Sequence, residues 1–292
     1  MLNNKRINTL IPIWVILLGL IMVVVSSCGK GSDHHNDDDI PQEDTTETEE
    51  LVIKVMSYNI HRGNPPSQQA NVIDLQATAD VIKAQRPDLV SLNEVDVHTK
   101  RSGIKLNEAK ELGRLTGMHA YFAKAMDYDE GQYGDAVLSR YPIVDSMRYE
   151  LPFAVAGSEP RDIAMIKIEV KGEVLLFAST HLDHLASEEN RILQANTIVN
   201  QILPRLKHPL IIGGDLNARP ESETIRTMGK KLTMGCMGGG CPLTFPYDKP
   251  DRSIDYIMVT PGEKFEFKSY TAISGMLASD HLPLVAEIVV KK

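Results

Sequence analysis

The chain has 292 residues, of which 31 are Lys or Arg and 39 are Asp or Glu, and its formal net charge is −8. Residues 28–50 alone carry nine acidic residues and one Lys, while residues 1–27 carry two basic residues. About −2 is therefore left for residues 51–292. This near neutrality excludes the strong overall basic bias of a tight, nonspecific nucleic-acid binder. It does not exclude a local basic rim.

The first residues have the pattern of an export signal. Lys5 and Arg6 precede an apolar stretch at 10–25, which is followed by two serines and Cys28. A charged start, an apolar middle and small residues before a cleavage point are typical of a secretory signal peptide over residues 1–27. The stretch is shorter than the roughly 20 residues of a spanning helix, and an uncleaved membrane anchor is the alternative interpretation.

The sequence VSSC at 25–28 resembles the bacterial lipobox. The resemblance implies that Cys28 becomes the lipidated first residue of an exported lipoprotein, held at a membrane on the periplasmic or outer cell surface. Residues 28–50 are acidic and contain a single aliphatic residue, Ile40. So little apolar surface predicts a disordered tether. His34 and His35 could chelate a metal, but we interpret them as part of this spacer.

Residues 51–292 are enough for one domain with a large core. Apolar runs rich in Val, Ile and Leu predict strands buried on both faces; they are 52–58, 89–93, 136–139, 163–170, 174–180, 210–213, 254–259, 265–271 and 285–290. Capping residues and apolar spacing predict helices at 75–84 after Asp74, at 107–116 before Gly117, and at 187–203 from Ser187. This pattern indicates an α/β architecture of sheets covered by helices.

Polar side chains stand at or near the ends of six of these runs. They are Asn59, Glu94, His181, Asp215 with Asn217, Asp255, and Asp280 with His281. Such groups are costly to bury without partners. If they gather at one edge of the sheets, they can partner one another and a hard cation. The pattern therefore predicts a metal-assisted hydrolase.

Seven motifs occur in a fixed order across residues 51–292. They are MSYNI, SLNEVD, YGDAVLSRYPI, STHLD, GGDLNARP, SIDYI and SDHLPL. Together they resemble the endonuclease/exonuclease/phosphatase superfamily, which includes deoxyribonuclease I, abasic-site endonucleases, bacterial sphingomyelinases and inositol-polyphosphate phosphatases. The resemblance implies a four-layer sandwich, in which two mixed β-sheets pack face to face with helices outside. It also implies hydrolysis of phosphate esters with a divalent metal.

By this resemblance Asn59, Glu94 and Asp280 hold the metal. Mg²⁺ prefers a few hard oxygen ligands and keeps water at its other positions, and Mn²⁺ is the alternative ion. Glu94 offers a carboxylate, and Asn59 a neutral carbonyl oxygen. Taken singly, Glu94 could equally be a surface residue after a strand, and Asn59 could be a residue whose side chain bonds a turn.

His281 is the candidate general base, because an imidazole titrates near neutral pH. Asp255 matches the family position that orients this histidine, and Asp280 is expected to point away from it, toward the metal. Asp215 and Asn217 are two residues apart, which in extended chain places both side chains on one face. The resemblance makes Asp215 the group that orients the attacking water and Asn217 a donor to a phosphate oxygen.

His181 matches a family histidine that donates to the phosphoryl oxygen or to the leaving group, and Asp183 is expected to support it. Tyr133 and Arg161 are further candidates for substrate binding. Arg161 could bind phosphate in a bidentate manner or pair with a carboxylate. The chain departs from the family at Asp135, where an Asn or an apolar residue is common, and this departure affects the substrate contacts nearby.

Cys236 and Cys241 lie in the glycine-rich loop MGCMGGGCP. In an exported protein, two close thiols favour a disulfide, and a zinc site would need more ligands than this loop offers.

The substrate is left open among nucleic acid, phospholipid and a small phosphate ester. Membrane anchoring and the near-neutral charge disfavour a nuclease, and the single Trp lies in the signal segment, so there is no aromatic hairpin for lipid insertion. We therefore expect a monomeric enzyme acting on small phosphate esters. The alternative is a surface lipoprotein that uses the same fold as a binding module without catalysis. The presence of every motif residue favours the enzyme.

Overall fold

The computed structural model describes residues 50–236 and 240–291, which belong to one compact unit. The predicted signal peptide, the lipidated Cys28 and the acidic tether lie outside the described residues, except for Glu50. Within the described residues, no helix is both long and apolar enough to cross a membrane.

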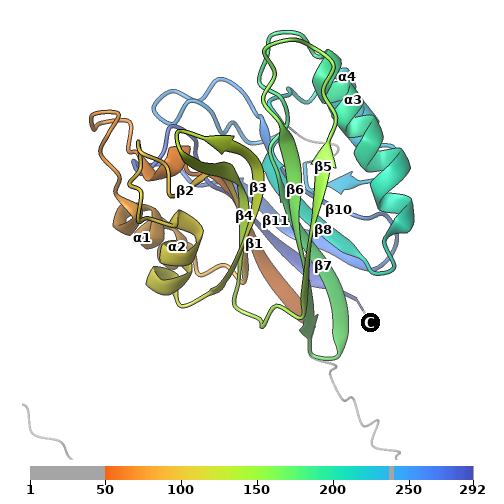
Figure 1. Cartoon of the computed structure of the whole chain (residues 1–292). Helices are drawn as coiled ribbons and strands as arrows, with labels where there is room; N and C mark the ends of the chain where they lie inside the picture. Colours follow the sequence, from red (N-terminus) through yellow and green to blue (C-terminus); the bar gives the residue numbers. More distant parts are fainter. Residues whose placement is uncertain (1–49, 237–239, 292) are drawn as a thin grey trace, which may run out of the picture. The chain divides into compact units, whose positions relative to one another are not determined.

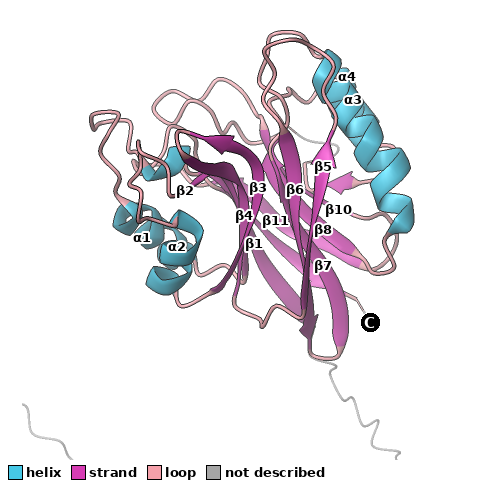
Figure 2. Ribbon diagram, in the orientation of Figure 1, coloured by secondary structure: helices cyan, strands magenta, loops and turns pink. Residues whose placement is uncertain are grey.

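Two six-stranded sheets form the centre of this unit (Figures 1 and 2). The first sheet has the strand order β11 (Phe265–Ala272), β12 (Leu284–Val290), β1 (Leu51–Asn59), β2 (Leu89–Val97), β4 (Gly131–Ser139) and β3 (His119–Tyr128). The second has the order β5 (Asp145–Leu151), β6 (Arg161–Val170), β7 (Glu173–Thr180), β8 (Leu210–Asp215), β10 (Asp255–Val259) and β9 (Thr233–Met234). Both sheets are mixed, because β1 pairs with β2 and β7 with β8 in parallel while the other pairs are antiparallel.

The two sheets pack face to face, and helices cover their outer faces. Buried side chains of both sheets, such as Ile53, Phe177 and Ile257, form the core between them. The helices α1 (Leu75–Gln85) and α2 (Glu108–Thr116) pack on the first sheet. The helices α3 (Glu189–Thr197) and α4 (Glu223–Met228) pack on the second. The predicted four-layer sandwich is therefore confirmed.

The predicted helix starts follow from side-chain capping. Asp74 accepts a hydrogen bond from the Ala77 amide at 2.9 Å and caps α1. Asn107 caps α2 in the same way, and Gly117 ends that helix with a φ of 71°. Each cap satisfies an amide that the first turn of the helix leaves without a partner.

The third predicted helix, 187–203, is shorter than expected. The α-helix covers Glu189–Thr197, and a π-helical turn at Ile198–Ile202 and a 3₁₀ turn at Leu203–Arg205 follow it. Pro204 explains the change, because a proline has no amide hydrogen to donate and its ring crowds the preceding turn.

Among the described strands and α-helices, four were not predicted: β3, β5, β9 and α4. The strands β3 and β5 lie at sheet edges and expose many of their residues, so they lack the continuous apolar run that marks a buried strand. The helix α4 has only six residues and β9 only two, which is too short for a periodic pattern.

Candidate active site

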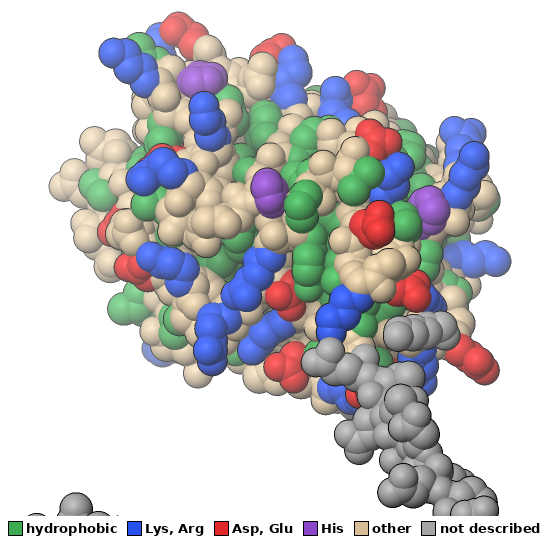
Figure 3. All heavy atoms as spheres, turned by 90° about the horizontal axis from the view of Figure 1, so that it is seen from below, with side chains coloured by type: hydrophobic (Ala, Val, Ile, Leu, Met, Phe, Trp, Pro, Cys, Tyr) green, Lys and Arg blue, Asp and Glu red, His purple; other side chains and the backbone are tan. Residues whose placement is uncertain are grey.

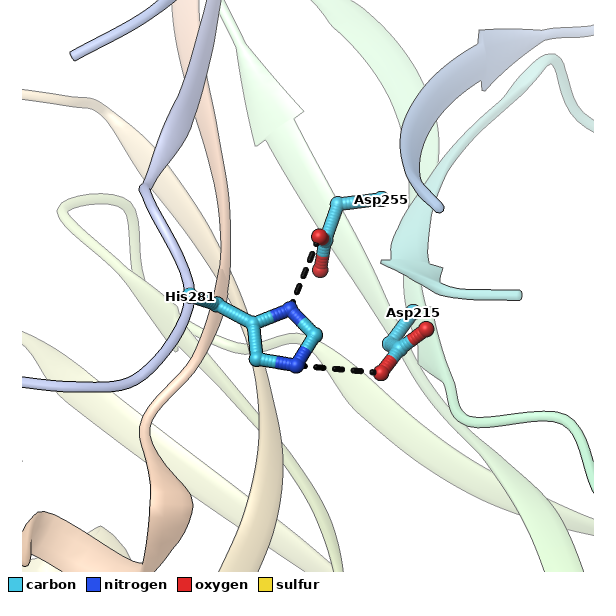
Figure 4. Close-up of side chains that lie close together, drawn as sticks. All are labelled: Asp215, Asp255 and His281. Carbon is cyan, nitrogen blue, oxygen red and sulfur yellow. Dashed lines mark hydrogen bonds and ion pairs between the residues drawn. The ribbon is translucent and has the colours of Figure 1, made fainter. Parts of the chain in front are cut away.

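His281 and Asp255 form the hydrogen-bonded pair that the motifs predicted. His281 Nδ1 lies 2.9 Å from Asp255 Oδ2, and both side chains are buried. Asp255 begins β10, and His281 lies in the segment before β12 (Figure 4). On the other side of the ring, His281 Nε2 lies 3.6 Å from Asp215 Oδ2 at the end of β8. The ring also packs against Phe245, with centroids 4.7 Å apart.

The two carboxylates change the electrostatics of His281. Burial opposes a charged imidazole, but the nearby Asp255 and Asp215 outweigh it and raise the pKa of His281 to about 10. Burial, together with the charge of Asp255, raises the pKa of Asp215 to about 7. The pair of acids therefore favours a proton on His281 in the metal-free chain.

The predicted metal residues also lie at this site. Glu94 and Asp280 both line the same pocket as His281, and the buried Asn59 donates from Nδ2 to Glu94 Oε1 at 3.0 Å and to Asp215 Oδ2 at 3.1 Å. The side-chain oxygen of Asn59 accepts from the His61 amide at 3.0 Å. Asn59 therefore orients the two carboxylates through its amide group, and its role as a metal ligand stays a prediction.

Glu94 does not stand at the end of a strand, as the sequence suggested. The strand β2 continues to Val97, and its register with β4 shifts between Leu92 and Val95. Glu94 lies in this bulge with a φ of 59°. A bulge re-aims a side chain that would otherwise follow the alternation of the strand, and a positive φ in a residue other than glycine is frequent at functional sites.

The donor set suits a hard divalent cation. Among the described residues, neither Glu94 nor Asp280 forms an ion pair with Lys or Arg, and Asp280 has only His61 at 3.9 Å. The pocket therefore contains two carboxylates that no described Lys or Arg neutralises. Carboxylate oxygens are the donors that Mg²⁺ and Mn²⁺ prefer. A second group, Asp215 with Asp255 and His281, has ligand atoms within 4.8 Å of one another. In that group, however, His281 Nδ1 already bonds Asp255.

His181 approaches the same carboxylate oxygen of Asp215 as His281 does. Its Nε2 is 3.6 Å from Asp215 Oδ2 and 3.0 Å from Asn217 Nδ2. Its Nδ1 is 3.2 Å from Nη1 of Arg161. Burial, and then the charge of Arg161, lower the pKa of His181 well below its ordinary value. The structure therefore brings His181, Asn217 and Asp215 together, and keeps His181 neutral.

Two expectations about this region are wrong. Asn217 is not in extended chain, because β8 ends at Asp215 and Asn217 has a φ of 47°. A turn brings it into the site, and its amide donates to Asp215 Oδ1 at 2.8 Å. Asp183 does not contact His181; its carboxylate accepts from the Leu185 amide at 2.8 Å and shapes the following loop. A turn stabilised by a side chain cannot be distinguished from extended chain by spacing alone.

Gly214 lets β7 and β8 of the second sheet approach closely, and Asn93 of β2 joins the first sheet to the second. A side chain on Gly214 would overlap the carbonyl oxygen of Thr180, so this position requires glycine. Asn93 accepts from the Asp215 amide at 2.9 Å and donates to the Thr180 carbonyl at 3.0 Å and to Asp135 at 2.8 Å. Sequence reasoning missed Asn93, although it lies beside Glu94 in SLNEVD.

Arg161 and Tyr133 line the pocket, and both are buried. Nη2 of Arg161 lies 2.9 Å from Glu159 Oε2, so the carboxylate pairing that we considered is present. Burial raises the pKa of Tyr133 well above its ordinary value.

A third residue of the pocket, Arg101, was not predicted. It stacks over the Tyr128 ring at 4.3 Å and forms two hydrogen bonds to the buried Asp96, at 2.7 and 2.8 Å.

Glu108 is buried below Asp96, and burial raises its pKa to about 8. A carboxyl group whose pKa is raised on folding contributes fully to stability below its pKa in the unfolded chain, about 4.3. This contribution falls as the pH rises and is lost once the pH has passed about 8, where the native group also ionises. Between pH 5 and 8 the unfolding free energy of the parent protein should fall as the pH rises. We expect Glu108→Gln to reduce the slope of this fall by at most about 1.4 kcal/mol per pH unit. Urea titrations at several pH values measure the unfolding free energy of both proteins.

The control is Glu111→Gln in the same helix, where Arg114 lowers the pKa of the carboxyl group. That variant should keep the slope of the parent protein. Equal slopes for the parent protein and Glu108→Gln would contradict a protonated Glu108 in the native state.

The Cys236–Cys241 disulfide is present, in agreement with the prediction. Residues 237–239 between the two cysteines lie outside the described residues. A few residues later, Phe245 reaches the pocket and packs against His281.

Comparison with known proteins shows the family of this chain. The model of the Endonuclease/Exonuclease/phosphatase family matches residues 56–281, which include every predicted metal and catalytic residue. This chain belongs to that family. It is thus a member of a group of phosphatase-type and nuclease-type hydrolases, many of which use a divalent metal.

Family relatives resemble the chain over most of its length. The uncharacterized protein YbhP of Escherichia coli (strain K12) is 24% identical over 255 residues, which cover 83% of this chain and 98% of YbhP. A family structure from Beutenbergia cavernae has a TM-score of 0.68 with 23% identity, covering 82% of this chain and 72% of that one. A mannosyl-6-phosphatase from Bacteroides thetaiotaomicron has a TM-score of 0.67 with 20% identity, covering 81% and 99%. At these identities, the two structures establish the fold.

Proposed function

We propose that this chain is a metal-dependent phosphoric ester hydrolase, in which His281 takes the proton from the attacking water. The observation that carries the proposal is the Nδ1 to Oδ2 distance of 2.9 Å between His281 and Asp255. This contact leaves Nε2 of the same ring free to face the pocket. Asp255 holds the ring in place and stabilises the charged imidazole after it has accepted a proton.

The other side chains have complementary roles in this proposal. Asp215 lies 3.6 Å from both His281 Nε2 and His181 Nε2, where it can orient the water. Asn217 and His181 donate to the phosphoryl oxygens. A divalent ion, Mg²⁺ or Mn²⁺, held by Glu94 and Asp280 would neutralise charge on those oxygens and oppose the proton on His281.

The pocket supports a small anionic ester as the substrate. Its volume of about 550 Å³ suits a small molecule. It is lined by Arg101, Arg161, Arg191, Arg219 and Arg252. The hydrogen bonds of Arg191 and Arg219 go to backbone carbonyl oxygens, which leaves their charge available to an anion. The volume and the basic lining of this pocket favour a small phosphate ester over nucleic acid. Figure 3 shows a different face of the molecule, seen from below, on which basic and acidic side chains are interspersed.

A substrate screen tests the proposal. The purified domain is incubated with nitrophenyl phosphate, bis-nitrophenyl phosphate, plasmid DNA or sphingomyelin, each with Mg²⁺, with Mn²⁺ or with a chelator. We expect hydrolysis of a nitrophenyl ester that depends on the metal. Cleavage of plasmid DNA alone would indicate a nuclease. No hydrolysis of any of the four would overturn the proposal and favour a binding module.

We further propose that lipid on Cys28 anchors the chain to a membrane through the acidic tether. The support is the signal-like segment before it and the lipobox-like VSSC. The full-length protein should enter the detergent phase of a Triton X-114 extract, and Cys28→Ala should move it to the aqueous phase. Identical partitioning of the two proteins would contradict lipid attachment.

A further inference from the structure

The two pocket histidines each direct Nδ1 at a charged side chain, and the two charges are opposite. His281 Nδ1 lies 2.9 Å from the carboxylate of Asp255. His181 Nδ1 lies 3.2 Å from the guanidinium of Arg161. A carboxylate only accepts hydrogen bonds, and a guanidinium only donates them. His281 must therefore carry a hydrogen on Nδ1, while His181 must accept at Nδ1.

The contact with the charged Arg161 favours one position for the hydrogen of His181. A neutral imidazole has one N–H group, so a ring that accepts at Nδ1 carries the hydrogen on Nε2. The charge on the Nε2 side agrees, because the Asp215 carboxylate lies 3.6 Å from that atom. With the opposite tautomer, an N–H of His181 would point at an N–H of Arg161 inside a buried site, where an unsatisfied donor is costly.

We infer that Arg161 is a positioning residue that fixes His181 as a neutral Nε2–H donor toward the substrate. The inference deepens the proposed function and rests on it for the role of His181 in the reaction. A neutral ring that gave up its only N–H would become an imidazolate anion, which is not formed near neutral pH. His181 therefore stabilises a phosphoryl oxygen by hydrogen bonding and does not protonate the leaving group. The role of His281 is unchanged: it takes the proton from the attacking water.

Asn217 completes the arrangement. Its Nδ2 donates to the Leu182 carbonyl at 3.1 Å and lies 3.0 Å from His181 Nε2. An amide NH₂ only donates, so this contact by itself favours an acceptor at Nε2 and the hydrogen on Nδ1. Asn217 is neutral, however, whereas the guanidinium at Nδ1 is charged and the Asp215 carboxylate favours a hydrogen on Nε2. With Nε2–H, the contact between the two nitrogens is not a hydrogen bond, and the two N–H groups lack an acceptor among the described residues. A phosphoryl oxygen in front of both can accept from each of them. Two donors fixed before the substrate arrives are the preorganised arrangement that stabilises developing negative charge.

Arg161 is itself held firmly. Its side chain is 3% exposed, and its Nη2 contacts both Glu159 Oε2 at 2.9 Å and His184 Nδ1 at 3.2 Å. Asp135, which accepts from Asn93, lies near the guanidinium, and burial raises the pKa of its carboxyl group well above its ordinary value. The position where this chain departs from the family thus lies next to the arginine that controls His181.

The tautomer can be read directly by NMR on the metal-free, substrate-free domain. Two-bond ¹H–¹⁵N correlation spectra of the histidine rings show which nitrogen carries the hydrogen, and His181→Gln assigns the signals. We expect His181 to carry it on Nε2 and not to titrate between pH 6 and 8. Arg161→Met removes the donors at similar length, so His181 should shift toward the Nδ1–H form or gain a proton in this range.

Two variants serve as controls. Arg161→Lys keeps a charged donor and should keep the Nε2–H form, which covers the case in which Arg161→Met does not fold. His184→Ala removes a different contact of the same arginine and should leave the His181 signals unchanged. An Nδ1–H form in the parent protein, or an unchanged His181 spectrum in Arg161→Met, would overturn the inference.

Kinetics give a second readout. With an ester that the domain hydrolyses, Arg161→Met should lower kcat by about 100-fold, the scale for a misplaced transition-state donor, and Arg161→Lys should recover much of it. A raised KM with unchanged kcat would instead indicate an arginine that only binds substrate, and would count against the inference. If no ester is hydrolysed, the proposed function fails, whereas the NMR result still decides whether Arg161 sets the tautomer.

Discussion

His281→Ala is expected to lower kcat by at least about 100-fold, the usual scale for loss of a general base. The ring has no substitute at its position. Its Nδ1 is bonded to Asp255 at 2.9 Å, its backbone amide donates to Ser279 Oγ at 3.2 Å, and Phe245 packs against its face. Water could enter the space that the ring leaves, but it would not be oriented toward the phosphorus atom.

Asp255→Asn is the companion variant, because it keeps the volume but replaces an acceptor with an amide. The Asn can offer an N–H to Nδ1 and so favour the tautomer of His281 whose Nε2 cannot accept a proton. We expect a loss of similar size with little change in KM. The control is His119→Ala, which removes an exposed histidine of the edge strand β3. Near-parent rates in both His281→Ala and Asp255→Asn, in proteins shown by circular dichroism to be folded, would rule out this base.

Glu94→Gln is expected to remove most of the activity, by at least about 100-fold, and most of its response to Mg²⁺ or Mn²⁺. Gln keeps the volume and can still accept the hydrogen bond that Asn59 donates to Glu94 at 3.0 Å. The change therefore removes one negative charge and leaves the bulge of β2 intact. Because Asp280 would be the main remaining carboxylate for the ion, affinity should fall as well as rate.

Binding of Mn²⁺, followed by electron paramagnetic resonance, measures this effect without any substrate. Glu94→Gln should weaken Mn²⁺ binding by at least about 10-fold, in line with the loss of a ligand charge. The matched control is Glu169→Gln, a change of the same charge at an exposed position of β6. Unaltered Mn²⁺ affinity in Glu94→Gln would place the ion elsewhere, and Asp215 with Asp255 and His281 would then be the group to test.

The two predictions concern separate parts of one site, and the buried amides Asn59 and Asn93 link them. Asn59 donates to both Glu94 and Asp215, and Asn93 accepts from the amide of Asp215. Each Asn therefore joins the first sheet to the second at this edge of the sandwich. Changes at either Asn should affect metal binding and base catalysis together, because both functions depend on how the sheets are held.

The buried strands could be predicted from sequence because their residues are continuously apolar, and the capped helices because Asp74 and Asn107 precede them. The edge strands β3 and β5 could not, since they expose much of their polar surface. The length of α3 was overestimated because the apolar spacing continues into Ile198–Ile202, where the chain forms a π-helical turn in place of α-helix.

The sequence by itself determined the family, the residues that gather at the site and the pairing of His281 with Asp255, because these follow from residue types in ordered motifs. Only the tertiary structure decided how the side chains are aimed. It placed Glu94 on a bulge, turned Asn217 back toward Asp215, and set Arg161 against His181. The physical reason is that a hydrogen bond depends on direction and on the partner at each atom, and residues far apart in the chain supply those partners only after the two sheets have packed.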